Sequence, residues 1–114
     1  MLFKRKLFKS LEKYKNKRNF LNRMKEITDE KLEKYFDITG QALKKAKENI
    51  SKKEFAADFL DMAQRYFKDA KYFKEKGDYV NAFAALSYAH GWLDAGARIK
   101  LFDVHDSKLF TVDD

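Results

Sequence analysis

Apolar and polar positions alternate with a helical period through most of this chain. In residues 29–49 and 52–76, apolar side chains recur at three- and four-residue steps and charged side chains fill the opposite side. Residues 79–102 keep this spacing, but apolar or small side chains occupy almost their whole circumference. The chain has no proline and only four glycines, so it also lacks the turn chemistry of all-β folds. The pattern therefore predicts three helices.

Local signals mark where these helices begin. Thr28 is placed to cap the first helix, and Ser51-Lys52-Lys53-Glu54 has the form of a capping box for the second. Gly77 predicts a left-handed turn, after which Asp78 is placed to cap the third helix. Matched lengths and tight turns favour an all-α fold, an antiparallel up-down-up three-helix bundle over residues 26–102.

The third helix carries two apolar arcs on a helical wheel. The arc assigned to the bundle core contains Tyr79, Ala82, Phe83, Leu86, Ala89, His90, Leu93, Ala97 and Leu101. The second arc includes Tyr88, Trp92, Ile99 and Phe102. A three-helix bundle covers about half of each helix, so the second arc needs another cover. We predict an interaction face there, filled by the N-terminal segment, by a second copy in a homodimer, or by a protein partner.

The predicted core arc of the second helix consists mainly of aromatic residues. Its members are Phe55, Phe59, Met62, Tyr66, Ala70 and Phe73. Their three- and four-residue spacing predicts that they point into the bundle.

Charge is concentrated at the two ends of the chain. Residues 1–25 contain ten Lys or Arg and one acid, residues 26–102 contain fourteen and thirteen, and residues 103–114 contain one and four. Apolar residues at helical spacing in the first segment predict an additional basic amphipathic N-terminal helix. The acidic segment 103–114 is predicted to be irregular, with Leu109, Phe110 and Val112 as apolar anchors.

Three interpretations of the basic segment stay open. It can pack as a fourth helix, or its cations can bind nucleic-acid phosphates, and contact with an anionic membrane surface is the weaker alternative. The candidate nucleic-acid contacts are Lys4, Arg5, Lys6, Lys9, Lys13, Lys17 and Arg18.

Candidate catalytic chemistry is sparse. The chain has no cysteine, which excludes disulfides and thiolate chemistry. His90, Asp94 and Arg98 lie at four-residue steps and form a polar strip along one edge of the third helix. No Glu-x-x-His or His-x-x-x-His pattern accompanies them, so we predict an Asp94–Arg98 pair and a locally hydrogen-bonded His90 rather than a metal site. No catalytic residue, cofactor or small-molecule substrate is indicated.

Part of the sequence is similar to a known family. The runs Tyr66–Phe73 (YFKDAKYF), Gly77-Asp78 and Tyr88–Gly96 (YAHGWLDAG) resemble the archaeal family of short proteins labelled domain of unknown function 357. The resemblance covers roughly residues 28–104. It implies an archaeal, cytosolic three-helix bundle, with no established activity and no site residues to transfer.

A second, weaker resemblance concerns Arg98 and His105. Their spacing is similar to the Arg-x(4–6)-His motif of the higher eukaryote and prokaryote nucleotide-binding (HEPN) domains, helical bundles that include ribonucleases. His105 lies beyond the predicted helix end, so the match is loose. It implies nucleic-acid binding or RNA processing as an alternative function.

The sequence favours a non-enzymatic protein-interaction module, because no residues converge on a catalytic arrangement. No apolar run reaches the roughly 18 residues of a membrane span, so we expect a soluble protein, and the lack of cysteine favours a cytoplasmic location. The abundance of Lys, Glu, Phe and Tyr is typical of heat-adapted proteins and suggests a thermophilic source.

Overall fold

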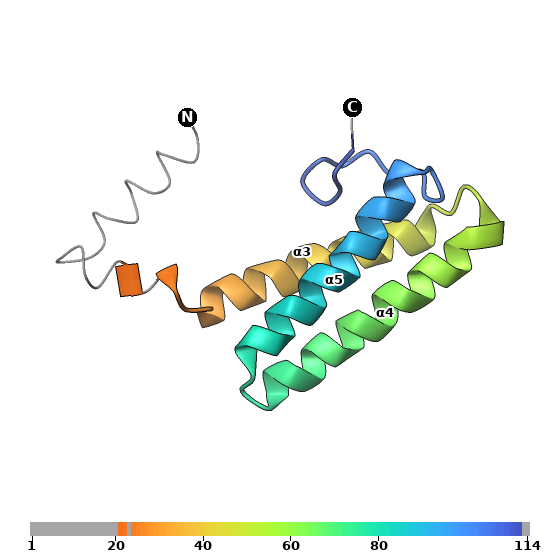
Figure 1. Cartoon of the computed structure of the whole chain (residues 1–114). Coiled ribbons are helices and arrows are strands. Elements are labelled where there is room, and N and C mark those ends of the chain that lie inside the picture. The colour runs from red at the N-terminus through yellow and green to blue at the C-terminus, as the bar shows by residue number, and fades with distance from the viewer. Residues whose placement is uncertain (1–20, 23, 113–114) are drawn as a thin grey trace.

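The computed structural model describes residues 21–22 and 24–112, and its architecture is a bundle of helices (Figure 1). The helices are α3 (Asp29–Glu48), α4 (Lys53–Glu75) and α5 (Tyr79–Arg98). Within the described residues there is no β-strand, only an isolated bridge between Ile50 and Phe102. The predicted all-α bundle is confirmed. The additional N-terminal helix was predicted for residues 1–25, and of these residues 1–20 and 23 lie outside the described part of the chain.

α5 is the central helix of the bundle. It makes its most extensive contact with α4, which runs antiparallel beside it, and a smaller contact with α3, whereas α3 and α4 touch each other least (Figure 1). This position explains why the sequence of α5 is apolar around so much of its circumference. Side chains of α4 therefore cover part of the second apolar arc of α5, for which the sequence predicted cover by the N-terminal segment, a second copy or a partner.

Two of the three predicted helix caps are confirmed. The Thr28 hydroxyl accepts a hydrogen bond from the Lys31 backbone N–H at 3.2 Å, and the Asp78 carboxylate accepts one from the Asn81 backbone N–H at 3.2 Å. Gly77 adopts φ 76°, the left-handed conformation that glycine allows before the third helix.

The Ser51 capping box is wrong. The N-cap of α4 is Lys52, and no side chain caps this helix. The backbone N–H groups of Ser51 and Lys52 instead donate to the Leu101 carbonyl oxygen at 2.8 and 3.2 Å. A tertiary contact from the turn after α5 therefore satisfies the first backbone N–H groups at this helix start, and sequence spacing does not reveal such a contact.

The predicted end of the third helix, residue 102, is also wrong. α5 ends at Arg98, and Lys100 takes φ 63° in a tight turn where the Leu101 backbone N–H donates to the Gly96 carbonyl oxygen at 2.8 Å. The turn folds the Phe102 ring back onto Gly96. A Cβ atom added at Gly96 would lie 2.3 Å from that ring, so the absence of a side chain makes the turn fit.

Small residues let the helices approach closely. On α4 the fully buried positions include Ala56, Ala63 and Ala70, one heptad apart, and they face Ala82, Leu86 and Leu93 in the two core clusters. The aromatic residues predicted as the α4 core flank this alanine line, and Phe55 is 56% exposed. The side of α4 that faces the core is therefore the alanine line, and the predicted core arc lies to one side of it.

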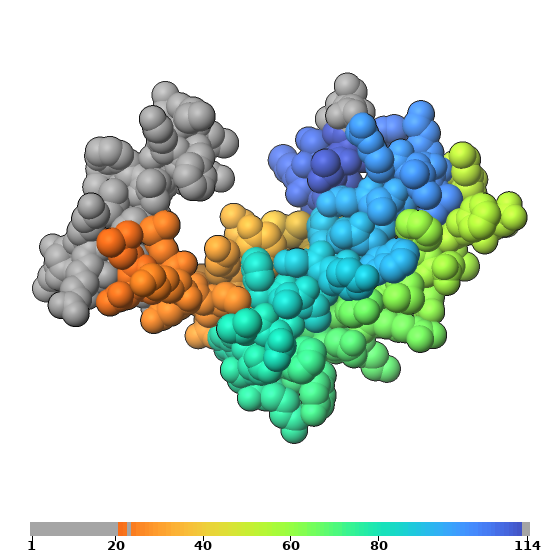
Figure 2. Space-filling view, viewed as in Figure 1, coloured from red at the N-terminus to blue at the C-terminus, as the bar shows by residue number. Residues whose placement is uncertain are grey.

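The C-terminal segment is irregular, as predicted, but it forms part of the core. Residues 103–112 follow the end of α5 and lie against the bundle, as the dark blue segment in Figures 1 and 2. Leu109 and Phe110 are 6% and 2% exposed, and Val104 is also buried. Val112 packs against the same cluster. The predicted anchors are confirmed.

Candidate functional site

Aromatic rings line the edge where α4 meets α5. The Phe59 and Trp92 ring centroids lie 5.2 Å apart and the Tyr66 and Tyr88 centroids 4.4 Å apart, both in edge-to-face geometry. A further edge contact joins Tyr88 to Trp92 at 6.4 Å. We call this edge the aromatic seam and include Phe55 and Ile99 in it. α4 and α5 run antiparallel, with Phe59 beside Trp92 and Tyr66 beside Tyr88. This register places Phe55, one turn before Phe59, beside the end of α5, and Ile99 directly follows that end.

The seam is partly open to solvent. Phe55 is 56% exposed, and Tyr88 and Ile99 are each 53% exposed. Trp92 is half-buried against Phe59, and among the described residues its indole N–H is buried without a hydrogen-bond acceptor. Exposed aromatic and aliphatic side chains beside a half-buried tryptophan form the kind of surface that protein interfaces use.

The structure brings together only part of the predicted interaction face. Tyr88, Trp92 and Ile99 lie along the seam as expected, but Phe102 does not. Phe102 is 2% exposed in the core, because the chain turns after Arg98 and folds its ring onto Gly96. The contribution of α4 was missed, since its aromatic residues have the same periodicity as core residues. The available signal was the line of alanines at positions 56, 63 and 70, which marks the true core side.

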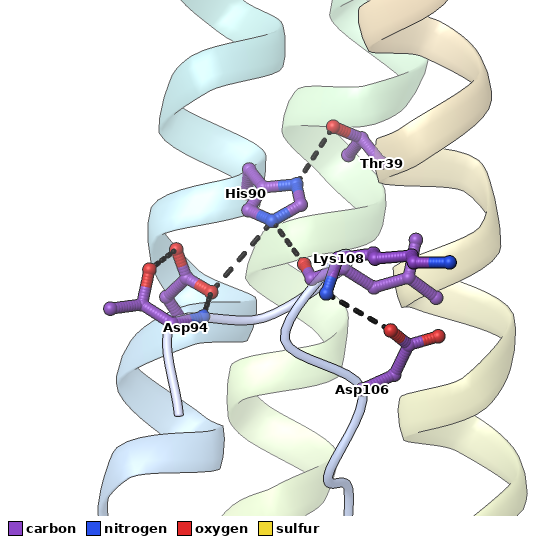
Figure 3. Close-up of polar contacts among 7 residues, drawn as sticks. Thr39, His90, Asp94, Asp106 and Lys108 are labelled. Atoms are coloured by element: carbon purple, nitrogen blue, oxygen red, sulfur yellow. Dashed lines mark hydrogen bonds and ion pairs between the residues drawn. The ribbon is translucent and has the colours of Figure 1, made fainter. Parts of the chain in front are cut away.

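A second site surrounds His90 on the opposite flank of α5 (Figure 3). The His90 Nε2 lies 2.6 Å from the Leu109 carbonyl oxygen, and Nδ1 lies 2.9 Å from the Thr39 hydroxyl on α3. A carbonyl can only accept, so Nε2–H is the donor, and in the neutral ring Nδ1 accepts from Thr39. The ring thus joins α3, α5 and the C-terminal segment. The sequence predicted local bonding for His90, and these partners are distant along the chain.

Asp94 holds the same segment one turn further along α5. Its carboxylate accepts hydrogen bonds from the Thr111 backbone N–H at 2.8 Å and from the Thr111 hydroxyl at 3.2 Å. The His90 Nε2 lies 3.7 Å from the same carboxylate. The described contacts of Asp94 are therefore to Thr111 and His90, where the sequence suggested Arg98.

Asp106 ties the segment to α3. Its carboxylate accepts from the Lys108 backbone N–H at 3.0 Å and from the Lys45 ammonium at 3.2 Å. The Lys108 N–H bond, followed by the Lys45 contact, lowers the pKa of Asp106 below its usual value.

His105 has no place in the His90 site. Its side chain is 77% exposed and its Nε2 lies 2.7 Å from the Asp103 carboxylate. Arg98 and His105 do line one hollow of about 430 Å³ at the end of the bundle, together with Lys100 and Ser51. His90 lines a different hollow, so of the polar strip only Arg98 shares a hollow with His105. Among the described residues, no three His, Asp or Glu side chains are grouped to hold a metal ion.

These features define a class of small α-helical bundle whose central helix is covered on one flank by an irregular C-terminal segment. The sequence profile of a family described as "Protein of unknown function (DUF357)" matches residues 34–102, more than half of the chain. The chain belongs to this family. Comparison with curated proteins and with solved structures gave no match. No helix in the described ranges is long and apolar enough to cross a membrane.

Proposed function

We propose that this chain is a non-enzymatic protein-interaction module that binds a protein partner through the aromatic seam. The observation that carries the proposal is the exposure of Phe55, Tyr88 and Ile99 along one edge of the bundle, each more than half exposed. Exposed apolar side chains that gather on one edge are typical of binding sites. Isolated ones are common on any surface and need no such explanation.

The seam has the composition of an interface core with a polar rim. Aromatic side chains give large contact area with few rotatable bonds, and tyrosine adds a hydrogen-bonding hydroxyl. On the outer side of α4, Arg65 and Asp61 form an exposed ion pair at 3.0 Å. A partner with an apolar strip edged by polar groups would match this arrangement.

Photocrosslinking tests the proposal directly. A benzophenone amino acid at position 99, at the seam, is expected to form a specific crosslink to a partner in the native host. The same group at Lys34, an exposed position on α3, is the control and is expected to give none. The partner identified by mass spectrometry is then titrated against purified full-length chain.

Two substitutions complete the test. Ile99→Asp at the seam is expected to weaken binding of that partner at least about tenfold, since an apolar contact is replaced by a buried charge. Lys34→Asp, which introduces the same side chain at the exposed α3 position used as the crosslinking control, is expected to leave binding unchanged. Equal crosslinking at both positions, or binding insensitive to Ile99→Asp, would contradict the proposal.

A second candidate function, nucleic-acid binding through residues 1–25, is favoured by the ten cations and one acid of that segment. The contacts would be Lys4, Arg5, Lys6, Lys9, Lys13, Lys17 and Arg18, all outside the described residues. Replacing these seven by glutamine is expected to abolish binding of single-stranded RNA and its steep salt dependence. RNA affinity that survives these substitutions would remove this candidate. RNA cleavage that is lost on His105→Ala would instead support an RNA-processing role.

A further inference from the structure

α5 has an exposed face that is almost without charge. Of the exposed residues on this helix, all of which the structure describes, only Arg98 is charged, whereas the exposed positions of α3 and α4 are mostly Lys, Arg, Asp and Glu. Figure 2 shows the helix, teal to blue, uncovered across the middle of the molecule. The other exposed residues of α5 are Val80, Asn81, Ala84, Ser87, Tyr88, Gly91 and Ala95. In a chain with 38% charged residues, the central helix therefore presents a neutral side to solvent.

Large apolar side chains project from this face. Val80 is 70% exposed, and Tyr88 and Ile99, which directly follows the helix, are each 53% exposed. The Tyr88 ring is held edge-to-face against Tyr66 at 4.4 Å, so its place is fixed. One turn further along, Gly91 leaves the helix backbone open, since an added Cβ atom would meet nothing within 4 Å. The face thus combines a projecting ring with a gap beside it.

The order of large and small residues on this face is nearly the same in both directions along the helix. Two sets with four-residue spacing make up the face, and they are Val80, Ala84 and Tyr88, then Gly91, Ala95 and Ile99. Their common midpoint lies between residues 89 and 90. Reversal of the helix about this midpoint exchanges the two large end residues, exchanges the two alanines, and brings the Tyr88 ring to the gap at Gly91. The face is therefore complementary to its own reversed copy.

We propose that the partner of the aromatic seam is a second copy of this chain, related by a two-fold axis that crosses α5 between residues 89 and 90, with the two α5 helices antiparallel. The partner is named for the same surface, so this inference rests on the proposed function. A two-fold dimer needs one surface that is complementary to itself. The exposed face of α5 meets this requirement, which a surface for an unrelated partner does not need to meet.

The same axis brings the two aromatic seams together. It lies in the plane of the interface at right angles to α5, so rotation about it reverses α5 but leaves α4 on the same side. With 20 residues in α5 and a second helix beside it, the contact face measures roughly 30 Å by 20 Å. This projected area of roughly 600 Å² is of the order of the 800 Å² per partner that specific interfaces bury.

Charges near the ends of α5 favour the antiparallel arrangement. Asp78 precedes the start of the helix and Lys100 follows its end. In the antiparallel pair, Asp78 of each copy lies close to Lys100 of the other, and the two helix dipoles oppose each other. A parallel pair would place like charges together at both ends.

Single cysteines test the register, because the chain contains no cysteine of its own. Ala84→Cys mixed with Ala95→Cys is expected to form a mixed disulfide dimer under mild oxidation, since the two exposed positions face each other. Each variant alone is expected to form none, because its two cysteines lie about 16 Å apart along the helix direction. A disulfide dimer of Ala84→Cys alone, or none from the mixture, would overturn the proposed two-fold arrangement.

Gly91→Glu tests the interface itself. It places two carboxylates close to the axis, while the single chain has room for the new side chain. Sedimentation equilibrium of the full-length proteins is expected to show a wild-type dimer and a dissociation constant at least about a hundredfold higher for Gly91→Glu. Ala57→Glu, at an exposed α4 position outside the seam, is the matched control and is expected to dimerise like wild type.

Circular dichroism of dilute Gly91→Glu is expected to match that of wild type, which shows that the single chain still folds. A wild-type chain that stays monomeric up to about 1 mM would overturn the proposal. A dimer that survives Gly91→Glu would do the same, because it would be formed by another surface.

The photocrosslink at position 99 separates this inference from the proposed function. A crosslinked product with twice the mass of the chain supports both. A crosslink to a different protein, from a chain that is monomeric, would overturn the second copy and leave the interaction module in place. A monomeric chain that gives no specific crosslink would remove both.

Discussion

The His90 ring and the Thr39 hydroxyl join α5 to α3 at 2.9 Å, at a point where Thr39 is only 1% exposed. Thr39 is the one buried polar residue among the described core positions, and its hydroxyl donates to Nδ1 when the ring is neutral. The other ring nitrogen donates to the Leu109 carbonyl oxygen in residues 103–112, the C-terminal segment that we call the strap. One imidazole therefore couples the packing of two helices to the position of the strap.

Thr39→Val is expected to destabilise the fold by about 1–3 kcal/mol, because the His90 Nδ1 loses its partner in a largely buried place. The two side chains have nearly the same shape, so the loss measures the hydroxyl and not a cavity. Urea unfolding followed by circular dichroism gives the free energy of unfolding. Thr39→Ser, which keeps the hydroxyl, is the control for the hydrogen bond. A Thr39→Val protein as stable as wild type would show that the bond contributes nothing.

Two glycines of α5 form a matched pair with opposite expectations. A Cβ atom at Gly96 would lie 2.3 Å from the Phe102 ring, whereas a Cβ at Gly91 meets nothing within 4 Å. Gly96→Ala is expected to cost about 1–3 kcal/mol through displacement of that ring. Gly91→Ala is expected to stabilise by up to about 1 kcal/mol, since alanine is the better helix former. Thermal unfolding compares the two. Equal effects of both substitutions would contradict the packing of Phe102 on Gly96.

The helices and their order were predictable from the sequence because periodicity and capping residues are local signals. Thr28, Gly77 and Asp78 act within their own turns, so nothing distant could change their role. The start of α4 was less predictable, because the Leu101 carbonyl accepts the hydrogen bond from the Ser51 backbone N–H that a capping box would direct to the Glu54 side chain. The bond joins residues that are far apart in sequence.

The candidate site was predictable only in part for the same reason. A wheel identifies Tyr88 and Trp92 as lying outside the core, but it treats α5 as continuing to Phe102. Once the helix ends at Arg98, the ring of Phe102 turns inward. The partners of His90 and Asp94 come from the strap, whose irregular backbone has no period from which a register could be deduced.

Lys100 takes the left-handed conformation that favours glycine, with φ 63°. Lys100→Gly is therefore expected to stabilise the protein by about 1 kcal/mol, the usual cost of this conformation for a residue with a Cβ atom. The free energy of unfolding in urea measures the gain. Lys108→Gly, at an exposed position of the strap, is the control and is not expected to stabilise. Destabilisation by Lys100→Gly would mean that the lysine side chain makes a contact worth more than the strain.

Asp106 gives the strap a dependence on pH with a defined sign. Its pKa is lowered in the folded chain, first by the Lys108 N–H and then by Lys45, so the unfolded chain binds this proton more readily. The stabilisation is therefore complete above the ordinary pKa of 3.8 and is lost as pH falls through the lower folded value. Asp106→Asn removes the titrating carboxyl group.

The difference in free energy of unfolding between wild type and Asp106→Asn is thus expected to be largest near neutral pH. It should shrink toward zero in acid, as the wild-type carboxylate is protonated and loses its charged bond to Lys45. Urea titrations of both proteins at matched ionic strength, from about pH 6 down to the lowest pH at which each stays folded, measure this difference. Added salt at about 0.5 M weakens the Lys45 contact, because that pair is exposed, but leaves the Lys108 N–H bond. A difference that stays constant across the titration would show that Asp106 does not hold the strap through its charge.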